Sequence, residues 1–313
     1  MSEGSAVPIK VSGLRKAFGA VAAVDNLSFQ CEAGEVFGLV GPDGAGKTTI
    51  MRLLAGVMAP DAGSIAIEGV DIVADPEQSR ARISYRPQRF GLYEDLTVDE
   101  NIEFFADLFA IDRLTRDERA ERLLRASGMT PFRKRRAGQL SGGMKQKLGL
   151  ACSLIHTPRA LLLDEPTAGV DPVSRRDFWR ILYGLRGEGV AIVIATSYLD
   201  EAERCGRLGL LHHGRMLYCD TPHNLKALMP GELLAVSSHE GRRVREAIGG
   251  LVGVQGAIPM GDAVHVVVDD AAQRAGEIEA ALKSAGVAFE EIERIAPTIE
   301  DLFVALLSRE EAT

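Results

Sequence analysis

The hydrophobic residues of this chain follow two alternating patterns, short apolar runs and helical stripes. Segments 35–40, 160–163 and 190–195 are apolar runs of strand length without a helical stripe. Between positions 50 and 57, and again between 178 and 185, apolar residues recur three and four positions apart, as on one face of an amphipathic helix. Buried strands that alternate with such helices predict an α/β fold around a parallel sheet.

Weaker signals predict further short strands joined by turns. Segments 9–11, 21–24 and 27–29 have strand composition, and segment 65–67 alternates as in a half-buried strand. The dipeptide Gly214-Arg215 predicts a hairpin turn between two apolar segments.

The pattern becomes helical between about 98 and 127. Thr97 and Glu100 have the spacing of a capping box, which begins a helix, and apolar residues recur on one face after them. Because this segment separates two strand signals, we expect a helical lobe beside the sheet, at about 96–157.

From Gly231 the order of elements changes. The patterns predict strand, helix, strand, strand, helix and strand, followed by a helix from Pro297 to Leu307. This order fits a small ferredoxin-like α+β appendage. The chain is thus divided into a flexible N-terminus (1–8), a main domain (9–230) and a C-terminal accessory domain (231–313).

The uneven distribution of charge along the chain also indicates two parts with different roles. The segment from Gly231 onward carries 15 acidic and 7 basic residues, whereas the preceding 230 residues carry 29 of each. Neither part has the basic excess of a nucleic-acid-binding protein, so we expect no nucleic-acid partner.

Composition indicates an ordinary globular protein, with 46% hydrophobic and 26% charged residues. No run approaches the roughly 18 apolar residues of a membrane span, and the N-terminus lacks the features of a secretory signal. The four cysteines, which form no CxxC pair, are expected to be reduced residues of a cytosolic protein.

The first chemical motif is the glycine-rich stretch Gly41–Thr49, GPDGAGKTT, between a predicted strand and a predicted helix. Glycines let the backbone approach an anion closely, and the helix N-terminus directs partial positive charge at it. Lys47 is placed to reach the β- and γ-phosphates, and the Thr48 hydroxyl to ligate Mg²⁺. The alternative is a glycine-rich turn that only caps a helix. The full strand–loop–helix context favours a nucleoside triphosphate.

The second motif is the pair Asp164-Glu165 at the end of the run 160–163. Ligands of parallel sheets bind beyond the carboxyl ends of the strands, where two carboxylates suit a site better than a core. Asp164 could hold Mg²⁺, and Glu165 could orient or deprotonate an attacking water. Two exposed loop acids are the alternative reading for this pair taken alone.

Three further positions have both a structural and a functional reading. Ser141 precedes Gly142 and Gly143 as a helix N-cap, and bare glycine amides at a helix start suit an anion. Asp171 before Pro172 also has the pattern of an N-cap. Phe18 is either a base-stacking aromatic or an ordinary core or turn residue.

Three stretches in this order, GPDGAGKTT, LSGGMKQ and LLLDEP, resemble the ATP-binding-cassette (ABC) ATPases over about residues 9–225. Other motifs resemble the ATPases of type-2 ABC exporters, of the drug- and lipid-exporting kind: Tyr85–Gln88, Glu94–Val98 with Glu100-Asn101, Ala168–Pro172, Asp200–Glu203 and Pro297–Phe303. The resemblance implies a P-loop NTPase fold with a RecA-like core, a β-subdomain and a helical subdomain.

The resemblance also implies ATP and Mg²⁺ as ligands. ATP would be bound by Phe18, stacked on adenine, and by the loop residues Gly41, Pro42, Asp43, Gly44, Ala45, Gly46, Lys47, Thr48 and Thr49. Thr48, Gln88 and Asp164 would lie on the Mg²⁺ side, with Gln88 also near the attacking water, and Glu165 would be the catalytic carboxylate.

Other implied roles involve partners. Ser141, Gly142 and Gly143 would reach the γ-phosphate held by a second cassette, and Asp171 would lie at the dimer interface. The loop after Gln88 would face the permease.

Two residues depart from the pattern of this family. Ser197 stands where a histidine usually contacts the γ-phosphate and orients the catalytic glutamate, and a hydroxyl has a shorter reach and no imidazolium character. We therefore expect slow hydrolysis, or an asymmetric pair whose other site carries the histidine. His212 and His213 lie beyond a helix and are not expected to substitute. Asp43 stands where asparagine is commoner, and we expect its carboxylate to point outward.

The resemblance implies a subunit that binds and hydrolyses ATP to power an exporter. It would close as a homo- or heterodimer against separate transmembrane permease subunits, at the cytoplasmic face of the cell membrane. One alternative is a non-transport ABC ATPase of translation or repair, which a single P-loop, no heptad run and no basic excess disfavour. The other is a cassette that binds ATP and hydrolyses it slowly because of Ser197.

Overall fold

The computed structural model describes residues 8–89 and 91–310. The chain divides into two compact units, and the boundary in the sequence falls between Cys219 and Asp220. The sequence placed this division somewhat later, between 230 and 231. Of the N-terminus expected to be flexible, residues 1–7 lie outside the described residues.

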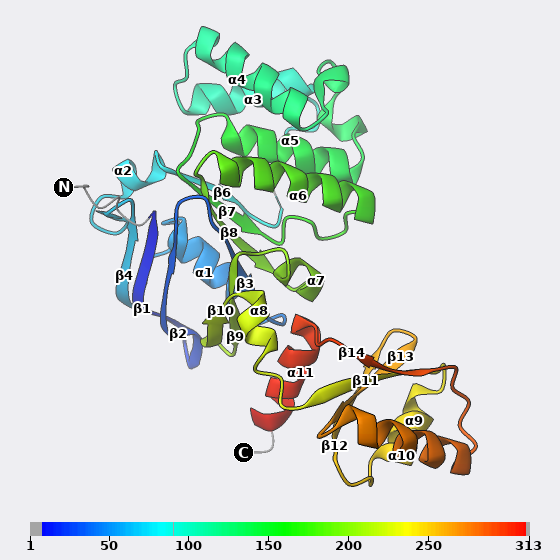
Figure 1. The fold of residues 1–313 in the computed structure, drawn as a ribbon. Coiled ribbons are helices and arrows are strands. Elements are labelled where there is room, and N and C mark those ends of the chain that lie inside the picture. The colour runs from blue at the N-terminus through cyan, green and yellow to red at the C-terminus, as the bar shows by residue number, and fades with distance from the viewer. Residues whose placement is uncertain (1–7, 90, 311–313) are drawn as a thin grey trace, which may run out of the picture. The chain divides into compact units, whose positions relative to one another are not determined.

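A six-stranded sheet forms the centre of the first unit (Figure 1). The three predicted apolar runs are its middle strands, and these pair in parallel with one another and with the strands beside them. In spatial order the strands are β10 (Arg215–Asp220), β9 (Arg207–His212), β3 (Val36–Val40), β8 (Ala191–Thr196), β7 (Ala160–Asp164) and β6 (Ile83–Arg86).

The carboxyl ends of the middle strands meet at one edge of this sheet. Val40 lies opposite Thr196, and Asp164 lies opposite Ala195. The residues of β3, β7 and β8 are buried throughout, which explains why these strands are uniformly apolar rather than alternating. The loops that leave this edge are therefore brought together by the register of the sheet.

Helices α1 (Lys47–Leu54) and α6 (Pro172–Gly187) contact the sheet. Figure 1 shows α1 between the parallel sheet and a second, antiparallel sheet. The predicted helical stripe continued to Val57, but α1 ends at Leu54 and the Val57 side chain is exposed. The chain turns at Gly56, whose φ of 63° is in the left-handed region that favours glycine.

The antiparallel sheet has the order β2-β1-β4-β5, formed by Ile9–Phe18 (β1), Val21–Cys31 (β2), Ala62–Ile67 (β4) and Val70–Asp71 (β5). Strands β1 and β2 are much longer than the three short strands that the sequence predicted. Their pairing contains register shifts between Val11 and Ala17, and such irregularities interrupt the alternation that marks a strand in a sequence.

The predicted helical lobe contains α3 (Val98–Leu108), α4 (Arg113–Ala126) and α5 (Gly142–Leu154), and two 3₁₀ turns, at Thr130–Phe132 and Ala137–Gln139, separate the last two. The predicted capping box begins α3: the backbone N–H of Glu100 donates to Thr97 Oγ1 at 3.2 Å, and the Thr97 N–H donates to Glu100 Oε2 at 2.7 Å. The start of this helix was thus predictable from local sequence.

Arg133, in the basic run 133–136 after α4, joins elements of this lobe. Its guanidinium donates to Asp99 of α3 at 2.8 Å and to Glu121 of α4 at 2.7 Å. The bond to Asp99 raises the pKa of Arg133, and the pKa of Glu121 is lowered mainly by its bond to Arg125 and further by Arg133. Arg133 therefore ties the turn after α4 to both helices.

His156, just after α5, connects the lobe to the sheet. Its ring stacks on Phe109 with a centroid distance of 3.8 Å, and its Nε2 lies 3.0 Å from the carbonyl oxygen of Ile83. Burial lowers the pKa of His156, and the bond to Ile83 acts in the opposite direction. The folded protein therefore favours the neutral ring.

We expect His156 to make the first unit acid-sensitive. Because its pKa is lower in the folded than in the unfolded chain, its stabilisation is present above the ordinary histidine pKa of about 6.5 and is lost as the pH falls through the folded value. His156→Gln keeps a donor for Ile83 but cannot titrate. Urea unfolding at a series of pH values should show a shallower loss of stability on acidification in the variant. Equal slopes would contradict the assignment.

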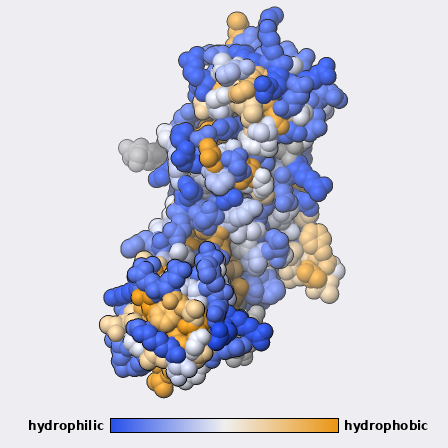
Figure 2. Space-filling view, turned by 90° about the vertical axis from the view of Figure 1, so that its right-hand side faces the viewer, coloured by the Kyte–Doolittle hydropathy of each residue, from blue (hydrophilic) through white to orange (hydrophobic). Residues whose placement is uncertain are grey.

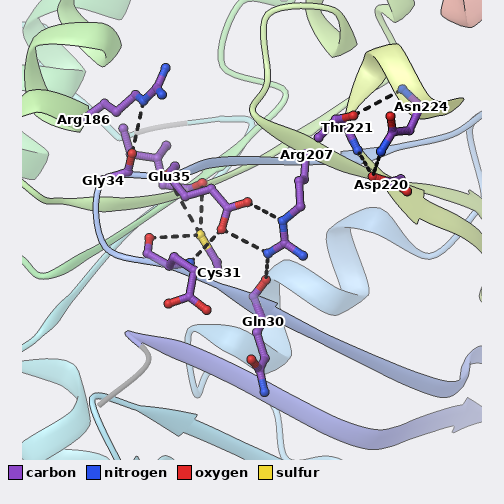
Figure 3. A network of polar contacts seen from close by, with 11 residues as sticks. Gln30, Cys31, Gly34, Glu35, Arg186, Arg207, Asp220, Thr221 and Asn224 are labelled. Atoms are coloured by element: carbon purple, nitrogen blue, oxygen red, sulfur yellow. Dashed lines mark hydrogen bonds and ion pairs between the residues drawn. The ribbon is translucent and has the colours of Figure 1, made fainter. Parts of the chain in front are cut away.

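The edge of the sheet opposite the strand ends is held by a polar network (Figure 3). The Arg207 guanidinium donates to Glu35 Oε1 at 2.7 Å and to the carbonyl oxygen of Gln30 at 2.8 Å. Arg186 of α6 donates to the carbonyl oxygen of Gly34 at 3.2 Å. These bonds fix the start of β3, the strand that leads into the glycine-rich loop.

The second unit contains a four-stranded antiparallel sheet in the order β12-β13-β11-β14. The order of its elements is the one that the sequence predicted, and this sheet order is that of a split βαβ, ferredoxin-like arrangement. Its elements after the short helix α8 (Pro222–Lys226) are β11 (Glu232–Ser237), α9 (Gly241–Ile248), β12 (Val254–Met260), β13 (Ala263–Val268), α10 (Ala271–Ser284), β14 (Ile292–Ile295) and α11 (Ile299–Glu310).

The last helix of this unit is held at its start. Asp301, which is fully buried, accepts hydrogen bonds from the backbone N–H and the hydroxyl of Thr298, and its other oxygen lies 2.6 Å from Nδ1 of His265 on β13. The motif at 297–303 therefore has a local structural role, because it caps α11 and joins it to the sheet.

The surface seen in Figure 2 is mostly hydrophilic, with separate apolar patches. Within residues 8–89 and 91–310, no helix has the length and apolar character needed to cross a bilayer.

Candidate nucleotide site

The glycine-rich loop turns from β3 into α1 at the edge where the parallel strands end. Gly46 precedes the helix with a φ of 99°, and an added Cβ there would collide with the carbonyl oxygen of Ala23. Glycine is therefore required both by the backbone conformation and by the close approach of β2. The loop takes this shape from local sequence and from the strand packed beside it.

Lys47, the first residue of α1, is buried with 6% of its side chain exposed. Its Nζ donates to the carbonyl oxygens of Gly41 and Pro42 at 2.8 and 3.1 Å and to Ser197 Oγ at 2.9 Å. Glu165 Oε1 lies 3.5 Å from the same nitrogen. The ammonium is thus held at the centre of the loop, with partners from three segments of the chain.

Glu165 follows β7 and faces the loop after β8. Its φ of 46° is left-handed, which is costly for a residue with a side chain and is common at functional sites. Its backbone N–H donates to the carbonyl oxygen of Ala195 at 2.8 Å. Ser197 donates to both carboxylate oxygens, from Oγ to Oε1 at 2.7 Å and from its N–H to Oε2 at 3.1 Å. The strained backbone therefore aims the Glu165 carboxylate at Ser197.

Asp43 lies on the inner side of the loop, so our expectation that it points outward was wrong. It lines the cavity of the site, and its Oδ1 lies 3.3 Å from Ser197 Oγ. A serine hydroxyl has one proton, and the shorter distance favours Glu165 as its acceptor. The two departures from the family pattern, Asp43 and Ser197, are therefore direct neighbours.

Thr48 and Asp164 supply oxygen atoms that suit Mg²⁺. Thr48 Oγ1 donates to Asp164 Oδ1 at 3.2 Å, and Gln88 lines the same cavity as Thr48. Hydroxyl, carboxylate and amide oxygens are hard ligands of the kind that Mg²⁺ prefers. Burial raises the pKa of Asp164, and it also raises that of neighbouring Tyr85 to about 12, an effect that the Asp164 charge adds to. A bound cation would offset the cost of burying the Asp164 charge.

These residues surround a cavity of about 530 Å³. Sequence reasoning assigned its loop residues, Gln88, Glu165 and Ser197, and did not identify other parts of its wall. The wall residues that it missed are Val21, Ala22, Ala23, Ala168, Tyr198 and His213.

His213 illustrates why part of the wall was missed. It lies in the β9–β10 turn, where the Gly214 N–H donates to the carbonyl oxygen of Ala45 at 3.2 Å and the Gly214 carbonyl accepts from Asp25 at 2.8 Å. The turn was predicted, but nothing in its sequence connects it to the glycine-rich loop. His213 lines the cavity beside the glycine-rich loop. The hydrogen-bond partners of the Ser197 hydroxyl are Lys47, Asp43 and Glu165 rather than His213.

Other predicted residues are not among the described residues that line this cavity. Phe18 ends β1 opposite Val21 and is half exposed. Ser141 caps α5 by accepting from the Met144 N–H at 3.3 Å, and Gly142 beside it is exposed.

The starts of α5 and α6 are packed together. A Cβ added to Gly143 would collide with the Ser174 side chain, so this glycine allows the two helices to approach. Asp171 caps α6 by accepting from the Ser174 N–H at 2.9 Å, and its hydrogen bonds to Ser174 lower its pKa. The capping role predicted for Asp171 is confirmed.

Comparisons with known proteins agree with this site. A model of the ABC transporter family matches residues 24–168. The chain is 50% identical over 238 residues to a probable multidrug ABC transporter ATP-binding protein, YbhF, of Escherichia coli (strain K12), a match that covers 75% of this chain and 41% of that relative. The chain thus spans about two fifths of the length of that protein.

Two other comparisons cover more of the length of the matched protein. The chain is 33% identical to the daunorubicin resistance ATP-binding protein DrrA2 of Streptomyces coeruleorubidus, over 95% of this chain and 94% of that one. A solved ATP-binding subunit of an ABC transporter is 29% identical, with a TM-score of 0.64, and the match covers 70% of this chain and 92% of that structure.

The resemblance and the fold class predicted from the sequence are confirmed by these matches. Proteins of this family bind ATP, are ATPases coupled to transport, form dimers of cassettes and act with transmembrane permease components. The site described above and the similarity along almost the whole chain lead to one conclusion: the chain belongs to the ATP-binding proteins of the ABC transporters.

Proposed function

We propose that this protein hydrolyses ATP to power export through separate permease subunits at the cytoplasmic face of a membrane. The observation that carries the proposal is the meeting of Lys47, Glu165 and Ser197 around one cavity, on loops that leave the same edge of the sheet. The names of the relatives, which concern multidrug transport and daunorubicin resistance, support the export direction.

In this proposal the chain's own groups divide the work on ATP. The loop amides and Lys47 hold the phosphates, as the N-terminus of α1 favours anions. Thr48, Gln88 and Asp164 hold Mg²⁺, which supplies electrostatic stabilisation of the phosphate charge. Glu165 orients the attacking water and accepts its proton. Phe18, half exposed at the end of β1, stacks on the adenine.

The site is completed by a second cassette. Ser141, Gly142 and Gly143 begin a 13-residue helix, and the first two are exposed and do not line the cavity of their own chain. Their backbone amides would therefore contact a γ-phosphate bound on a partner, and Asp171, also exposed, would lie at the interface between the cassettes.

The helical lobe supplies a surface for the permease. Tyr93, Phe104, Leu108 and Phe109 have 39 to 66% of their side chains exposed. The Tyr93 and Phe104 rings form an edge contact at 4.5 Å, and this cluster lies on α3 and the segment that follows Gln88. Exposed aromatic and aliphatic residues that gather on neighbouring segments mark an interaction site.

We expect Leu108→Glu to weaken recovery of the permease about tenfold, because a charge in the apolar part of an interface costs roughly 1–2 kcal/mol. The test is affinity capture of the tagged protein from membranes, followed by identification of the captured membrane protein. Val57→Glu is a matched control, since Val57 is equally exposed (68% against 66%) but lies beyond α1. Equal recovery by both variants would contradict this surface, and capture only with ribosomes would contradict the transport function.

A second candidate function, slow turnover with ATP acting mainly as a clamp, is favoured by Ser197. Its hydroxyl is shared among Lys47, Asp43 and Glu165, none of which supplies the basic ring found in the family. Glu165, however, keeps the position of the catalytic carboxylate. We therefore propose an active but slow ATPase.

A further inference from the structure

Glu201, on the short helix α7 (Leu199–Ala202), is a fully buried carboxylate near the site. Its Oε1 accepts from Thr167 Oγ1 at 2.5 Å and from Trp179 Nε1 at 3.2 Å, and its Oε2 accepts from Thr196 Oγ1 at 3.1 Å. The Arg175 Nε lies 3.8 Å from Oε1. Both oxygens are thus satisfied within the protein interior.

The hydroxyls bound to Glu201 lie next to the reacting groups, one in the loop that follows β7 and the other at the last residue of β8. Thr167 lies two residues after Glu165, and Thr196 immediately precedes Ser197. Beyond Glu201, the two loops meet again where Ser197 Oγ donates to Glu165 at 2.7 Å. One buried carboxylate therefore joins the loops on one side, and the Ser197–Glu165 bond joins them on the other.

We propose that Glu201 is a positioning residue that holds the Glu165 and Ser197 loops in one relative register for ATP hydrolysis. The proposal rests on the function proposed above, in which Glu165 and Ser197 act at the γ-phosphate. Displacements of about 1 Å in a catalytic group lower rates by as much as about a hundredfold, so a tie between these loops affects turnover directly. It affects ATP binding less, because the loop from Gly41 to Thr49 makes no hydrogen bond to Glu201 among the described contacts.

The surroundings explain why a carboxylate occupies this position. Among the described residues, the side chains bonded to this carboxylate all donate to it, and a carboxylate is an acceptor at both oxygens. The Thr196 hydroxyl oxygen also accepts from the Tyr198 N–H at 3.0 Å, which directs its own proton to Glu201. An amide would place a donor N–H₂ against one of these donors. Burying a carboxylate is costly unless it is bonded in this way.

Trp179 connects the same carboxylate to α6. It is the one tryptophan of the chain, it is fully buried, and its indole N–H donates to Glu201. Helix α6 begins at the Asp171 cap, against which Gly143 of α5 packs through Ser174. The fluorescence of Trp179 therefore reports directly on the Glu201 site.

The first experiment compares the Glu201→Gln variant with the wild-type protein. We expect kcat for ATP to fall about tenfold with KM changed less than twofold, since a displacement of about 1 Å in a catalytic group lowers the rate by up to about a hundredfold. We also expect a shift in Trp179 emission. Glu188→Gln is the matched control, because it makes the same change at a carboxylate that is 53% exposed and pairs with Arg122, and it should leave both readouts unchanged. Wild-type kcat in Glu201→Gln would overturn the proposal.

Two variants of Thr167 test the role of Glu201 if Glu201→Gln does not fold. Thr167→Ser keeps the hydroxyl that bonds Glu201, and Thr167→Val keeps the shape without it. We expect kcat to be retained in the serine variant and to fall about tenfold in the valine variant, within the loss that a small displacement of a catalytic group produces. Equal kcat values in the two would overturn the proposal.

Glu165→Gln, measured in the same assay, tests the assignment of the ATP site separately from the role of Glu201. If Glu165→Gln keeps its activity, the assignment of the site fails. If Glu165→Gln loses activity and both Glu201→Gln and Thr167→Val keep it, only the role of Glu201 fails.

Discussion

Glu165→Gln is expected to lower kcat for ATP hydrolysis about a thousandfold while ATP still binds. General-base catalysis contributes about 10²–10⁴-fold, and an amide of the same size cannot accept the proton of water. The variant keeps one oxygen for the Ser197 N–H, which donates to Oε2 at 3.1 Å, and its amide N–H₂ can donate to the Ser197 hydroxyl oxygen, which lies 2.7 Å from Oε1, so the loops should stay in place. The chemical step is therefore lost without loss of the nucleotide site.

Steady-state phosphate release and equilibrium ATP binding, measured on the same preparation, test this expectation. Glu188→Gln is a suitable control, because Glu188 is 53% exposed and contacts only Arg122 among the described ion pairs. A kcat within a factor of about two of wild type would show that another residue serves as the base. A loss of ATP binding in parallel with kcat would show that the lost Glu165–Lys47 ion pair matters for binding rather than for chemistry.

Ser197→His is expected to raise kcat about a hundredfold. This is the lower limit of what a positioned acid–base group contributes to a rate. Serine now offers one hydroxyl, placed 2.9 Å from Lys47 Nζ and 2.7 Å from Glu165. An imidazole reaches farther and can hold either a proton or a lone pair toward the phosphate. Ser197→Asn, which adds length without a basic ring, should not raise the rate. An unchanged rate in Ser197→His would contradict the proposal that Ser197 limits turnover.

Asp43 should modify this result, because it lies 3.3 Å from the Ser197 hydroxyl. A carboxylate beside a new imidazole would stabilise the protonated ring and draw it toward the loop. In a double-mutant cycle of Asp43→Asn and Ser197→His, we expect a coupling of about 1 kcal/mol in the activation free energy, as for other residues in contact. Additivity within about 0.3 kcal/mol would show that the two positions act independently.

Much of the fold was predictable because its signals are local. The parallel strands β3, β7 and β8 are buried on both faces and are therefore continuous apolar runs. The caps of α3, α5 and α6 were recognisable because a polar side chain must bond the first free N–H groups of a helix within three residues. The lengths of β1 and β2 were not predictable in the same way, since their register shifts break the alternating pattern.

The candidate site likewise combines features with a local sequence signal and features that depend on distant contacts. The glycine-rich loop and the Asp164-Glu165 pair each carry a local signal, because the chemistry of phosphate and metal binding demands certain residue types at close spacing. By contrast, the inward position of Asp43 and the presence of His213 in the wall depend on contacts between distant segments. The burial of Glu201 against Thr167, Trp179 and Thr196 is likewise invisible in a sequence motif.

The sequence by itself determined the class of fold, the ATP loop and the residues suited to act on a phosphate, since each follows from neighbours along the chain. Only the tertiary structure decided that Lys47, Ser197 and Glu165 meet within hydrogen-bond distance, although 150 residues separate the first two. The register of the parallel sheet places the ends of β3, β7 and β8 at one edge, and the contacts among the loops that leave it set the direction of each side chain.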